Sequence, residues 1–181
     1  SGVDLDVFRP QPRADARATL GWAPDERVVL FNGSRQTRRK RLDLAQAAAA
    51  VAARLLPGAR LEVLDGAVPA GRIATYMNAA DCLLLTSDSE GSPNVVKEAL
   101  ACDLPVVSVD VGDVRERVAG VTPGAVVGRD PEALGAALAA ILRDPVRSDG
   151  RAAVAALHTR VIAAGIVDVY RRVARRRAGI A

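Results

Sequence analysis

Short apolar runs alternate with segments of helical periodicity along most of the chain. The apolar runs occupy residues 27–33, 59–66, 82–87, 105–111 and 124–128, and the helical patterns occupy residues 42–58, 72–81, 93–102, 113–118 and 130–144. Strands that are separated by helices are joined by right-handed crossovers, which makes the strands parallel. The alternation therefore predicts a doubly wound, Rossmann-like α/β fold, with helices on both faces of a parallel sheet.

The length of the chain suits one domain with its own core. The 181 residues include 50% hydrophobic but 3% aromatic residues, and the abundance of Ala and Val favours close packing of helices on a sheet. The sequence shows no internal repeat and no low-complexity linker. We therefore expect one folded domain over residues 11–170, preceded by a linker segment (1–10) and followed by a basic helix end and tail (171–181).

The sequence also bears on the location of the chain. It contains no run of about eighteen uninterrupted apolar residues, and its first ten residues do not resemble a signal peptide. Cys82 lies in an apolar run and Cys102 near a helix end, so we interpret both as reduced core residues rather than as a disulfide framework. These features predict a cytoplasmic protein.

The stretch SDSEGSPNVVKEALACDLPVV, from Ser87 to Val107, contains a helix start with a carboxylate on each side. Pro93 suits the first helical position, and Ser92 is a typical N-cap residue. The first backbone N–H groups of this helix, on Asn94 and Val95, would then face the carboxyl edge of the sheet, where they form a site for an anion such as phosphate. The sequence predicts a phosphate-binding helix start here.

The two carboxylates of this stretch suit the hydroxyl groups of a ligand. Helical spacing predicts that Val95, Val96, Ala99 and Leu100 face the core and that Asn94, Lys97, Glu98 and Ala101 face away from it. An ionised carboxylate offers only acceptors, which fits vicinal hydroxyls rather than phosphate. Glu98 and Glu90 would therefore bind hydroxyls on opposite sides of a phosphate group, as in a nucleotide sugar.

A basic loop follows the first predicted strand, in FNGSRQTRRKR. Gly33 allows the backbone to approach a ligand closely at the end of the strand, and Ser34 follows it as a further candidate binding residue. Arg35 and Lys40 supply positive charge for a diphosphate, and charge-assisted contacts of this kind contribute about 1.5–3 kcal/mol each. We expect this loop and the helix start at Pro93 to meet on one ligand.

These motifs resemble a known signature. The run EGSPNVVKEALACDLPVVSVDVGDVRE is similar to the donor-binding signature of the retaining glycosyltransferases of family 4 (group 1), which have the GT-B fold. The E-x7-E spacing matches at Glu90 and Glu98, and the family's basic pair matches at Arg35 and Lys40. The opening SGVDLDVFRP resembles the interdomain segment that leads into the family's second domain. The resemblance extends from Gly2 to about Tyr170.

The resemblance implies a role for each residue of the site. Glu98 would hold the ribose hydroxyls, Glu90 the hydroxyls of the donor sugar, and the backbone of residues 92–95 the distal phosphate. Arg35 and Lys40 would bind the diphosphate and stabilise the charge that grows on it as it departs. The donor would be a UDP- or GDP-linked sugar, with no metal ion and no further cofactor. The resemblance also implies a first, acceptor-binding domain before Ser1, without which we expect the chain to transfer nothing.

The sequence departs from the family pattern at two positions where the family usually has glycine, namely Arg41 and Asp103. Asp tolerates the left-handed conformation better than a β-branched residue does, so we expect Asp103 to adopt a positive φ at the end of the helix. Arg41 has two interpretations, contact with an anionic acceptor or exposure to water.

Other interpretations of the motifs remain open at this stage. The two alternatives are half of a nucleotide-sugar 2-epimerase and a non-catalytic module that binds a nucleotide sugar or an anionic polymer. Nucleic acid is disfavoured as a partner because aromatic residues for base stacking are scarce. We assign no catalytic or metal role to His158, and we interpret the Asp4-Leu5-Asp6 sequence as a chance match to a metal-binding motif. The arginines of residues 171–177 suit either a solvated helix end or contact with the inner face of an anionic membrane.

Overall fold

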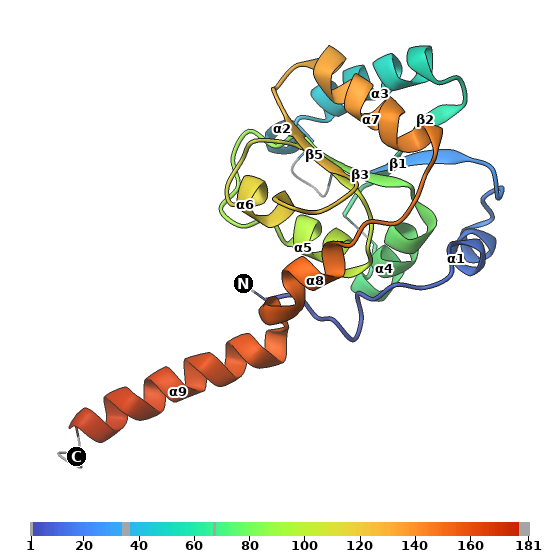
Figure 1. The fold of residues 1–181 in the computed structure, drawn as a ribbon. Helices are drawn as coiled ribbons and strands as arrows, with labels where there is room; N and C mark the ends of the chain where they lie inside the picture. The colour runs from blue at the N-terminus through green and yellow to red at the C-terminus, as the bar shows by residue number, and fades with distance from the viewer. Residues whose placement is uncertain (1, 34–36, 67, 178–181) are drawn as a thin grey trace.

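The computed structural model describes residues 2–33, 37–66 and 68–177. Its centre is a five-stranded sheet with the strand order β2-β1-β3-β4-β5 (Figure 1). The strands are β1 (Arg27–Asn32), β2 (Ala59–Leu64), β3 (Cys82–Leu85), β4 (Val106–Val109) and β5 (Gly124–Val127). Every pairing in this sheet is parallel. The predicted parallel α/β sheet is confirmed.

Helices cover both faces of the sheet, as predicted for crossover connections. Helices α3 (Leu42–Leu55) and α7 (Pro131–Arg143) pack against each other above the sheet in Figure 1. Helices α4 (Ala70–Ala79) and α5 (Asn94–Ala101) lie below it, where α1 (Arg13–Leu20) packs on α4 and α8 (Gly150–Val154) packs on α5. Two short helices, α2 (Thr37–Lys40) and α6 (Val114–Val118), lie beside the sheet.

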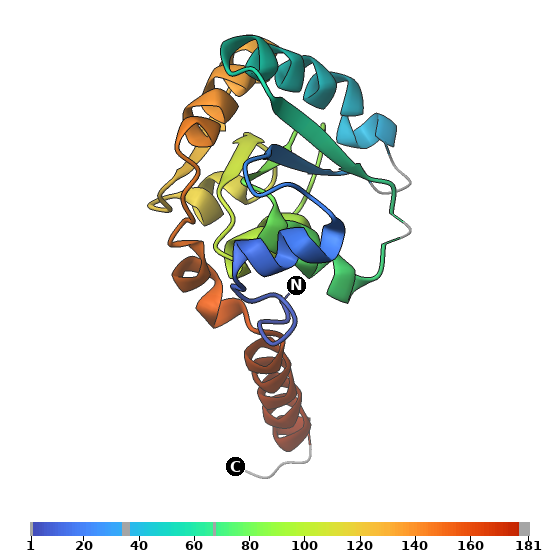
Figure 2. The same cartoon turned by 90° about the vertical axis from the view of Figure 1, so that its right-hand side faces the viewer.

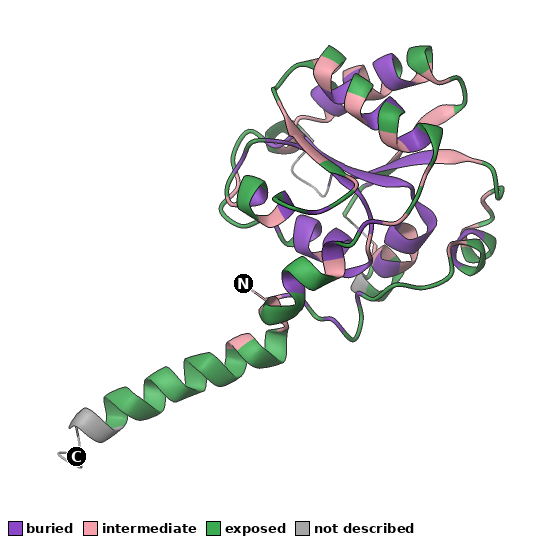
Figure 3. Ribbon diagram, in the orientation of Figure 1, coloured by how far each residue is buried: buried purple, intermediate pink, exposed green. Residues whose placement is uncertain are grey.

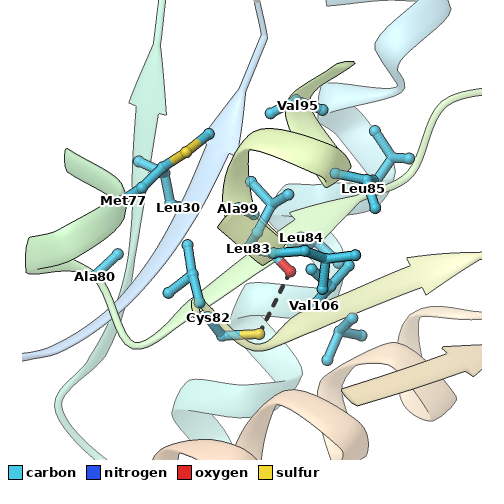
Figure 4. Packing of buried hydrophobic residues seen from close by; sticks show 14 of the residues in the cluster. Leu30, Met77, Ala80, Cys82, Leu83, Leu84, Leu85, Val95, Ala99 and Val106 are labelled. Atoms are coloured by element: carbon cyan, nitrogen blue, oxygen red, sulfur yellow. Dashed lines mark hydrogen bonds between the residues drawn. The ribbon is translucent and has the colours of Figure 1, made fainter. Parts of the chain in front are cut away.

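The core lies between the sheet and the two helix layers (Figure 3). Strands β3 and β4 are buried along their whole length, as expected for central parallel strands whose sequences are continuous apolar runs. Figure 4 shows Leu30, Met77 and Cys82 among the packed core residues, together with Val95 and Ala99 of α5. Cys82 and Cys102 are both buried and free, and burial raises the pKa of the Cys102 thiol to about 12. Both therefore serve as core residues, as the sequence indicated.

The N-terminal segment meets the residues just before α9 beneath α5 and α8. Val3 is buried, and its N–H donates to Leu157 O at 2.9 Å while its carbonyl accepts from Thr159 N–H at 2.9 Å. Arg151 donates to the carbonyls of Phe8 and Leu5. The segment predicted as a linker is thus packed on the domain.

After α8, a 3₁₀ turn (Ala155–Leu157) leads into α9 (Thr159–Arg177), which projects away from the domain in Figures 1 and 2. None of the helices described is both long and apolar enough to cross a membrane.

Arg41 and Asp103, which stand where the resembling family usually has glycine, both adopt the left-handed conformation. Among the described residues other than glycine, Arg41 (φ 56°) and Asp103 (φ 54°) have positive φ. Asp103 N–H donates to Leu100 O at 2.9 Å and Leu104 N–H donates to Ala99 O at 2.9 Å, which is the hydrogen-bond pattern of a Schellman motif. The prediction for Asp103 is confirmed. Arg41 takes the same conformation between α2 and α3.

Candidate functional site

A surface hollow of about 300 Å³ lies at the carboxyl ends of the strands, where parallel α/β sheets bind their ligands. It is lined by Asn32, Arg39, Lys40, Ile73, Glu90, Pro93, Asn94, Val95 and Glu98. These residues come from the end of β1, from α2 and α4, from the loop after β3 and from the first turns of α5. The fold therefore brings together side chains that are up to 66 positions apart in the sequence (Asn32 and Glu98).

Most of the residues that the sequence predicted for the site line this hollow. Lys40, Glu90, Pro93, Asn94, Val95 and Glu98 do so. Gly33 is buried just behind it, where its N–H donates to Leu64 O at 3.0 Å. A Cβ on Gly33 would lie 3.3 Å from that same carbonyl oxygen, so the residue allows β1 and β2 to stay close where they end. Ser34 and Arg35 lie outside the described residues.

The central contact of the hollow joins two residues that the sequence assigned to different parts of the ligand. Lys40 Nζ donates to Glu90 Oε1 at 2.7 Å, and both side chains are nearly buried. Arg39 Nη1 lies 3.9 Å from the other carboxylate oxygen. Partial burial alone would raise the pKa of Glu90, but the hydrogen bond and charge of Lys40 hold that pKa below its ordinary value. Glu90 is therefore ionised at neutral pH.

Glu98 is the second carboxylate at the hollow, and its surroundings differ from those of Glu90. It points out of the core, as predicted, but is half-buried. Burial raises the pKa of Glu98, and the charges of Lys97 and Lys40 offset part of this shift. Among the described residues Glu98 forms no ion pair within 4 Å, and a half-desolvated carboxylate of this kind is well suited to accept hydrogen bonds from neutral hydroxyl groups.

The prediction that Ser92 caps the helix at Pro93 is wrong. Helix α5 begins at Asn94, its N-cap residue is Pro93, and no side chain caps it. Ser92 Oγ instead donates to Asp113 Oδ2 at 2.7 Å. The first backbone bond that closes the helix runs from Val96 N–H to Pro93 O. Asn94 and Val95 nevertheless line the hollow, so the positive end of the helix dipole faces it as predicted.

The outward positions of Lys97 and Ala101 were also predicted wrongly. Both are buried, and Lys97 is 1% exposed. Ala101 lies against α8, which the sequence did not predict and which packs on α5, and Arg151 donates to Ala101 O at 2.7 Å. Lys97 lies beside Asp113 and Arg117, on the loop after β4 and on α6. Lys97 Nζ donates to Ser92 Oγ at 3.0 Å. Burial lowers the pKa of Lys97, and the charge of Asp113 opposes this shift.

Two arginines beside the hollow fix the loop that follows β3. Arg129 donates to the carbonyls of Thr86 and Ser87 at 3.0 Å each. Arg41 pairs with Asp43 at 2.8 Å and with Asp88 at 3.2 Å, so in this structure its guanidinium is held by protein carboxylates. Sequence reasoning missed Arg129, although a basic residue directly after the strand run at 124–128 was a usable signal.

Asp4, Asp6 and His158, to which we assigned no functional role, contact other residues near the start of the chain and of α9. Asp4 Oδ1 accepts from the backbone N–H groups of Asp6 and Val7, and Asp6 pairs with Arg160 at 2.9 Å. His158 lies at the start of α9, beside the same aspartate. Within the part of the chain that the structure describes, no group of three or more His, Cys, Asp or Glu side chains is arranged to hold a metal ion.

Comparison with known proteins gives a consistent result. A family model described as glycosyl transferases group 1 matches residues 48–144. A D-inositol 3-phosphate glycosyltransferase of Segniliparus rotundus is 37% identical over 185 residues, which cover 85% of this chain and 41% of the relative. A protein of the same name from Thermobispora bispora is 31% identical, with 93% of this chain and 48% of the relative covered. The chain thus spans less than half the length of these curated relatives.

Solved structures share the fold. Sucrose-phosphate synthase from Thermosynechococcus elongatus has a TM-score of 0.78 and 26% identity, covering 95% of this chain and 51% of that one. The C-terminal domain of a group 1 glycosyl transferase from Francisella tularensis has a TM-score of 0.69 and 19% identity, covering 85% of this chain and 97% of that one. The Anabaena protein HepE, solved with UDP and glucose, has a TM-score of 0.61 and 18% identity, covering 98% of this chain and 55% of that one.

Proposed function

The chain belongs to the glycosyl transferases of group 1, and we propose that it is the domain that binds the nucleotide-sugar donor in an enzyme that transfers the sugar with retention of configuration. One observation carries the proposal. Lys40, Glu90 and Glu98 come from three separate segments and line one hollow, together with the N-terminus of α5. This set offers a cation, two carboxylates and a helix dipole, which complement the phosphates and hydroxyls of a nucleotide sugar.

Each of these groups has a chemical task in the proposal. Glu98 accepts hydrogen bonds from the ribose hydroxyls, and Glu90 accepts them from the sugar that is transferred. Lys40, together with Arg35, binds the diphosphate and stabilises the negative charge that develops on it as the glycosidic bond breaks. The N-terminus of α5 faces the distal phosphate. The donor in this proposal is UDP- or GDP-linked, and transfer needs no metal ion.

The acceptor belongs to another part of the enzyme. Transfer requires that donor and acceptor be held together in near-attack geometry, with water excluded by closure of a cleft. The groups identified here all face the donor. We therefore propose that an acceptor-binding domain completes the site, and that this chain alone binds donor without transferring it. A non-catalytic binding module is the alternative, and the glycosyltransferase relatives give it no support.

The basic helix α9 supports a peripheral role at a membrane. Thr159–Arg177 contains six arginines and one aspartate, a net charge of +5 against +4 for the whole chain. Val161, Ile166, Val169 and Tyr170 are each at least half exposed on one side of this helix. A basic helix with exposed apolar residues along one side can bind an anionic lipid surface. We propose such a surface as the partner of α9, on the cytoplasmic side of the membrane.

Titration of the purified chain with nucleotides tests the proposed function. We expect UDP or GDP to bind, and Glu98→Ala to weaken that binding by at least about tenfold, or about 1.4 kcal/mol. Glu132→Ala is the matched control, because Glu132 also lies on a helix but pairs with Arg54 far out on the surface, where its side chain is 66% exposed. Absence of nucleotide binding in the wild-type chain would reject the proposal, and so would equal losses in the two variants.

A further inference from the structure

We propose that Asp113 is a positioning residue, which holds the turn of residues 90–92 so that Glu90 and the N-terminus of α5 stand correctly at the hollow. The inference rests on the proposed function, since it concerns how the donor site is kept in shape. Asp113 is not among the residues that line the hollow, and it precedes the short helix α6 on the loop that follows β4.

Asp113 holds two successive residues of the turn through two different groups. Its carboxylate Oδ2 accepts from Ser92 Oγ at 2.7 Å, and its backbone N–H donates to Gly91 O at 3.1 Å. Arg117 Nε donates to the same Oδ2 at 2.9 Å and so fixes the carboxylate from the other side. The hydrogen bonds from Ser92 and Arg117 outweigh partial burial and hold the pKa of Asp113 below its ordinary value.

Gly112 lets the two loops come this close. Its φ is +57°, and a Cβ at this position would lie 2.4 Å from Gly91 O and 2.9 Å from Glu90 O. Contacts under about 3 Å are not tolerated by backbone atoms, so any side chain here would push the turn away from the loop. The backbone that carries Glu90 therefore rests directly on residues 112 and 113.

Lys97 ties the same turn to α5. Its nearly buried ammonium group donates to Ser92 Oγ at 3.0 Å. A hydroxyl group has one hydrogen, and Ser92 can use it only toward Asp113, because an ammonium group accepts nothing. The two hydrogen bonds therefore have a fixed direction, from Lys97 to Ser92 and from Ser92 to Asp113. Together they link α5, the turn and the loop after β4.

This network has a specific consequence for the ligand. The Glu90 side chain is held by Lys40 at 2.7 Å, and its backbone is held by the turn of residues 90–92. Glu98 instead lies within α5, one turn beyond the start of the helix. Loosening the turn displaces the groups that meet the sugar and the distal phosphate, but leaves the proposed ribose contact in place. The loss of affinity should therefore depend on which parts the ligand contains.

The test compares Asp113→Asn with Asp110→Asn in the full chain. Asp110 lies on the same loop but pairs with Arg115 at the surface, where its side chain is 54% exposed. The ligands are UDP-glucose and UMP, or GDP-mannose and GMP if the wild type prefers guanine. We expect Asp113→Asn to weaken binding of the nucleotide sugar by at least about fivefold and that of the monophosphate by less than about twofold, with Asp110→Asn unchanged.

Ser92→Ala should reproduce this split, and the double variant should lose less affinity than the sum of the two single losses, because Ser92→Ala removes the link that Asp113→Asn weakens by removing its charge. Equal losses for both ligands would show a general structural role and overturn the inference, as would no loss at all.

Amide hydrogen exchange over residues 88–96, measured without ligand, separates this inference from the proposed function. We expect faster exchange in Asp113→Asn than in Asp110→Asn. If the wild-type chain binds no nucleotide, the proposed function fails, and the exchange rates alone decide whether Asp113 holds the turn. Equal exchange in the two variants would overturn the inference even if nucleotides bind.

Discussion

Lys40 Nζ and Glu90 Oε1 lie 2.7 Å apart at the centre of the hollow, on side chains that are 12% and 11% exposed. This pair joins the cation proposed for the diphosphate with the carboxylate proposed for the sugar. A diphosphate that enters the hollow competes with Glu90 for the ammonium group, and a sugar hydroxyl competes with Lys40 for the carboxylate. In the proposed complex, the diphosphate and the sugar would therefore each compete with one partner of the Lys40–Glu90 ion pair.

The first prediction follows from this opposition. Glu90→Gln frees Lys40 from its carboxylate, so we expect tighter binding of the bare nucleoside diphosphate, by about two- to fivefold. The same variant should bind the nucleotide sugar more weakly, because an amide is a poorer acceptor for the sugar hydroxyls. Isothermal titration with both ligands measures the two effects. Glu132→Gln is the control, and a change of the same sign for both ligands would contradict the assignment.

The second prediction concerns Glu98 and the dependence of stability on pH. The folded-state pKa of Glu98 is raised, chiefly by burial, so its ionisation opposes folding at neutral pH, and this penalty disappears as the pH falls below the ordinary pKa of Glu. We expect Glu98→Gln to melt at a higher temperature than the wild type at pH 7 and at the same temperature near pH 4. The variant should nevertheless bind nucleotide about tenfold more weakly. A lower melting temperature at pH 7 would show that the carboxylate stabilises the fold instead.

The third prediction separates conformation from hydrogen bonding at Asp103. Besides its positive φ, Asp103 accepts from Arg151 N–H through Oδ1 at 2.8 Å, which holds the start of α8. Asp103→Gly relieves about 1 kcal/mol of left-handed strain and loses a hydrogen bond of about 1 kcal/mol, so it should be nearly neutral. Asp103→Ala keeps the strain and loses the bond, and should destabilise the fold by about 1–2 kcal/mol.

Urea unfolding of these variants measures both effects. Asp103→Asn is the control, because Asn tolerates the left-handed conformation and keeps an acceptor. If Asp103→Gly were as destabilising as Asp103→Ala, the hydrogen bond to Arg151 would outweigh the conformational term.

The fourth prediction tests the lipid contact of α9. Arg171→Ala combined with Arg172→Ala should weaken binding to vesicles rich in phosphatidylserine by at least about fivefold, since each arginine near such a surface contributes about 1 kcal/mol. Arg54→Ala combined with Arg115→Ala removes the same charge elsewhere and should have little effect. Co-sedimentation at two salt concentrations gives the measurement. Equal binding to neutral vesicles, or self-association through α9 in place of vesicle binding, would reject a lipid surface as the partner.

The sequence predicted the sheet because each strand lies in a short, largely apolar run bounded by turn residues, a signal that is local. It predicted the sides of α5 less well, because Ala101 lies against α8, which is about fifty residues further along the chain, and Lys97 lies beside Asp113 on the loop after β4. A helix of five residues with little apolar periodicity, such as α8, gives almost no signal of its own. What covers a helix cannot be inferred from the helix alone.

The site residues also divide into those that a local motif revealed and those whose contacts depend on distant parts of the chain. The spacing of Glu90 and Glu98 and the basic loop were visible in the sequence, because they lie within single motifs. The role of Ser92 was not, since its local preference for capping gives way to a bond with Asp113, 21 positions away. The Lys40–Glu90 pair spans 50 positions and depends on the order of strands β1 and β3 in the sheet. Contacts between motifs depend on the order of the strands in the sheet, which cannot be inferred from the individual motifs.

The last prediction is that the chain binds a nucleotide sugar but does not transfer the sugar. The site groups that the structure describes line the one hollow proposed for the donor, and the chain spans 41–48% of the curated relatives. Without a positioned acceptor the reaction loses its effective molarity, which contributes about 7–11 kcal/mol to lowering a barrier. We therefore expect no transfer above background in a donor-turnover assay with candidate acceptors, and transfer once an acceptor-binding domain is added. Turnover by this chain alone that Glu90→Ala abolishes would show that the site is complete as it stands.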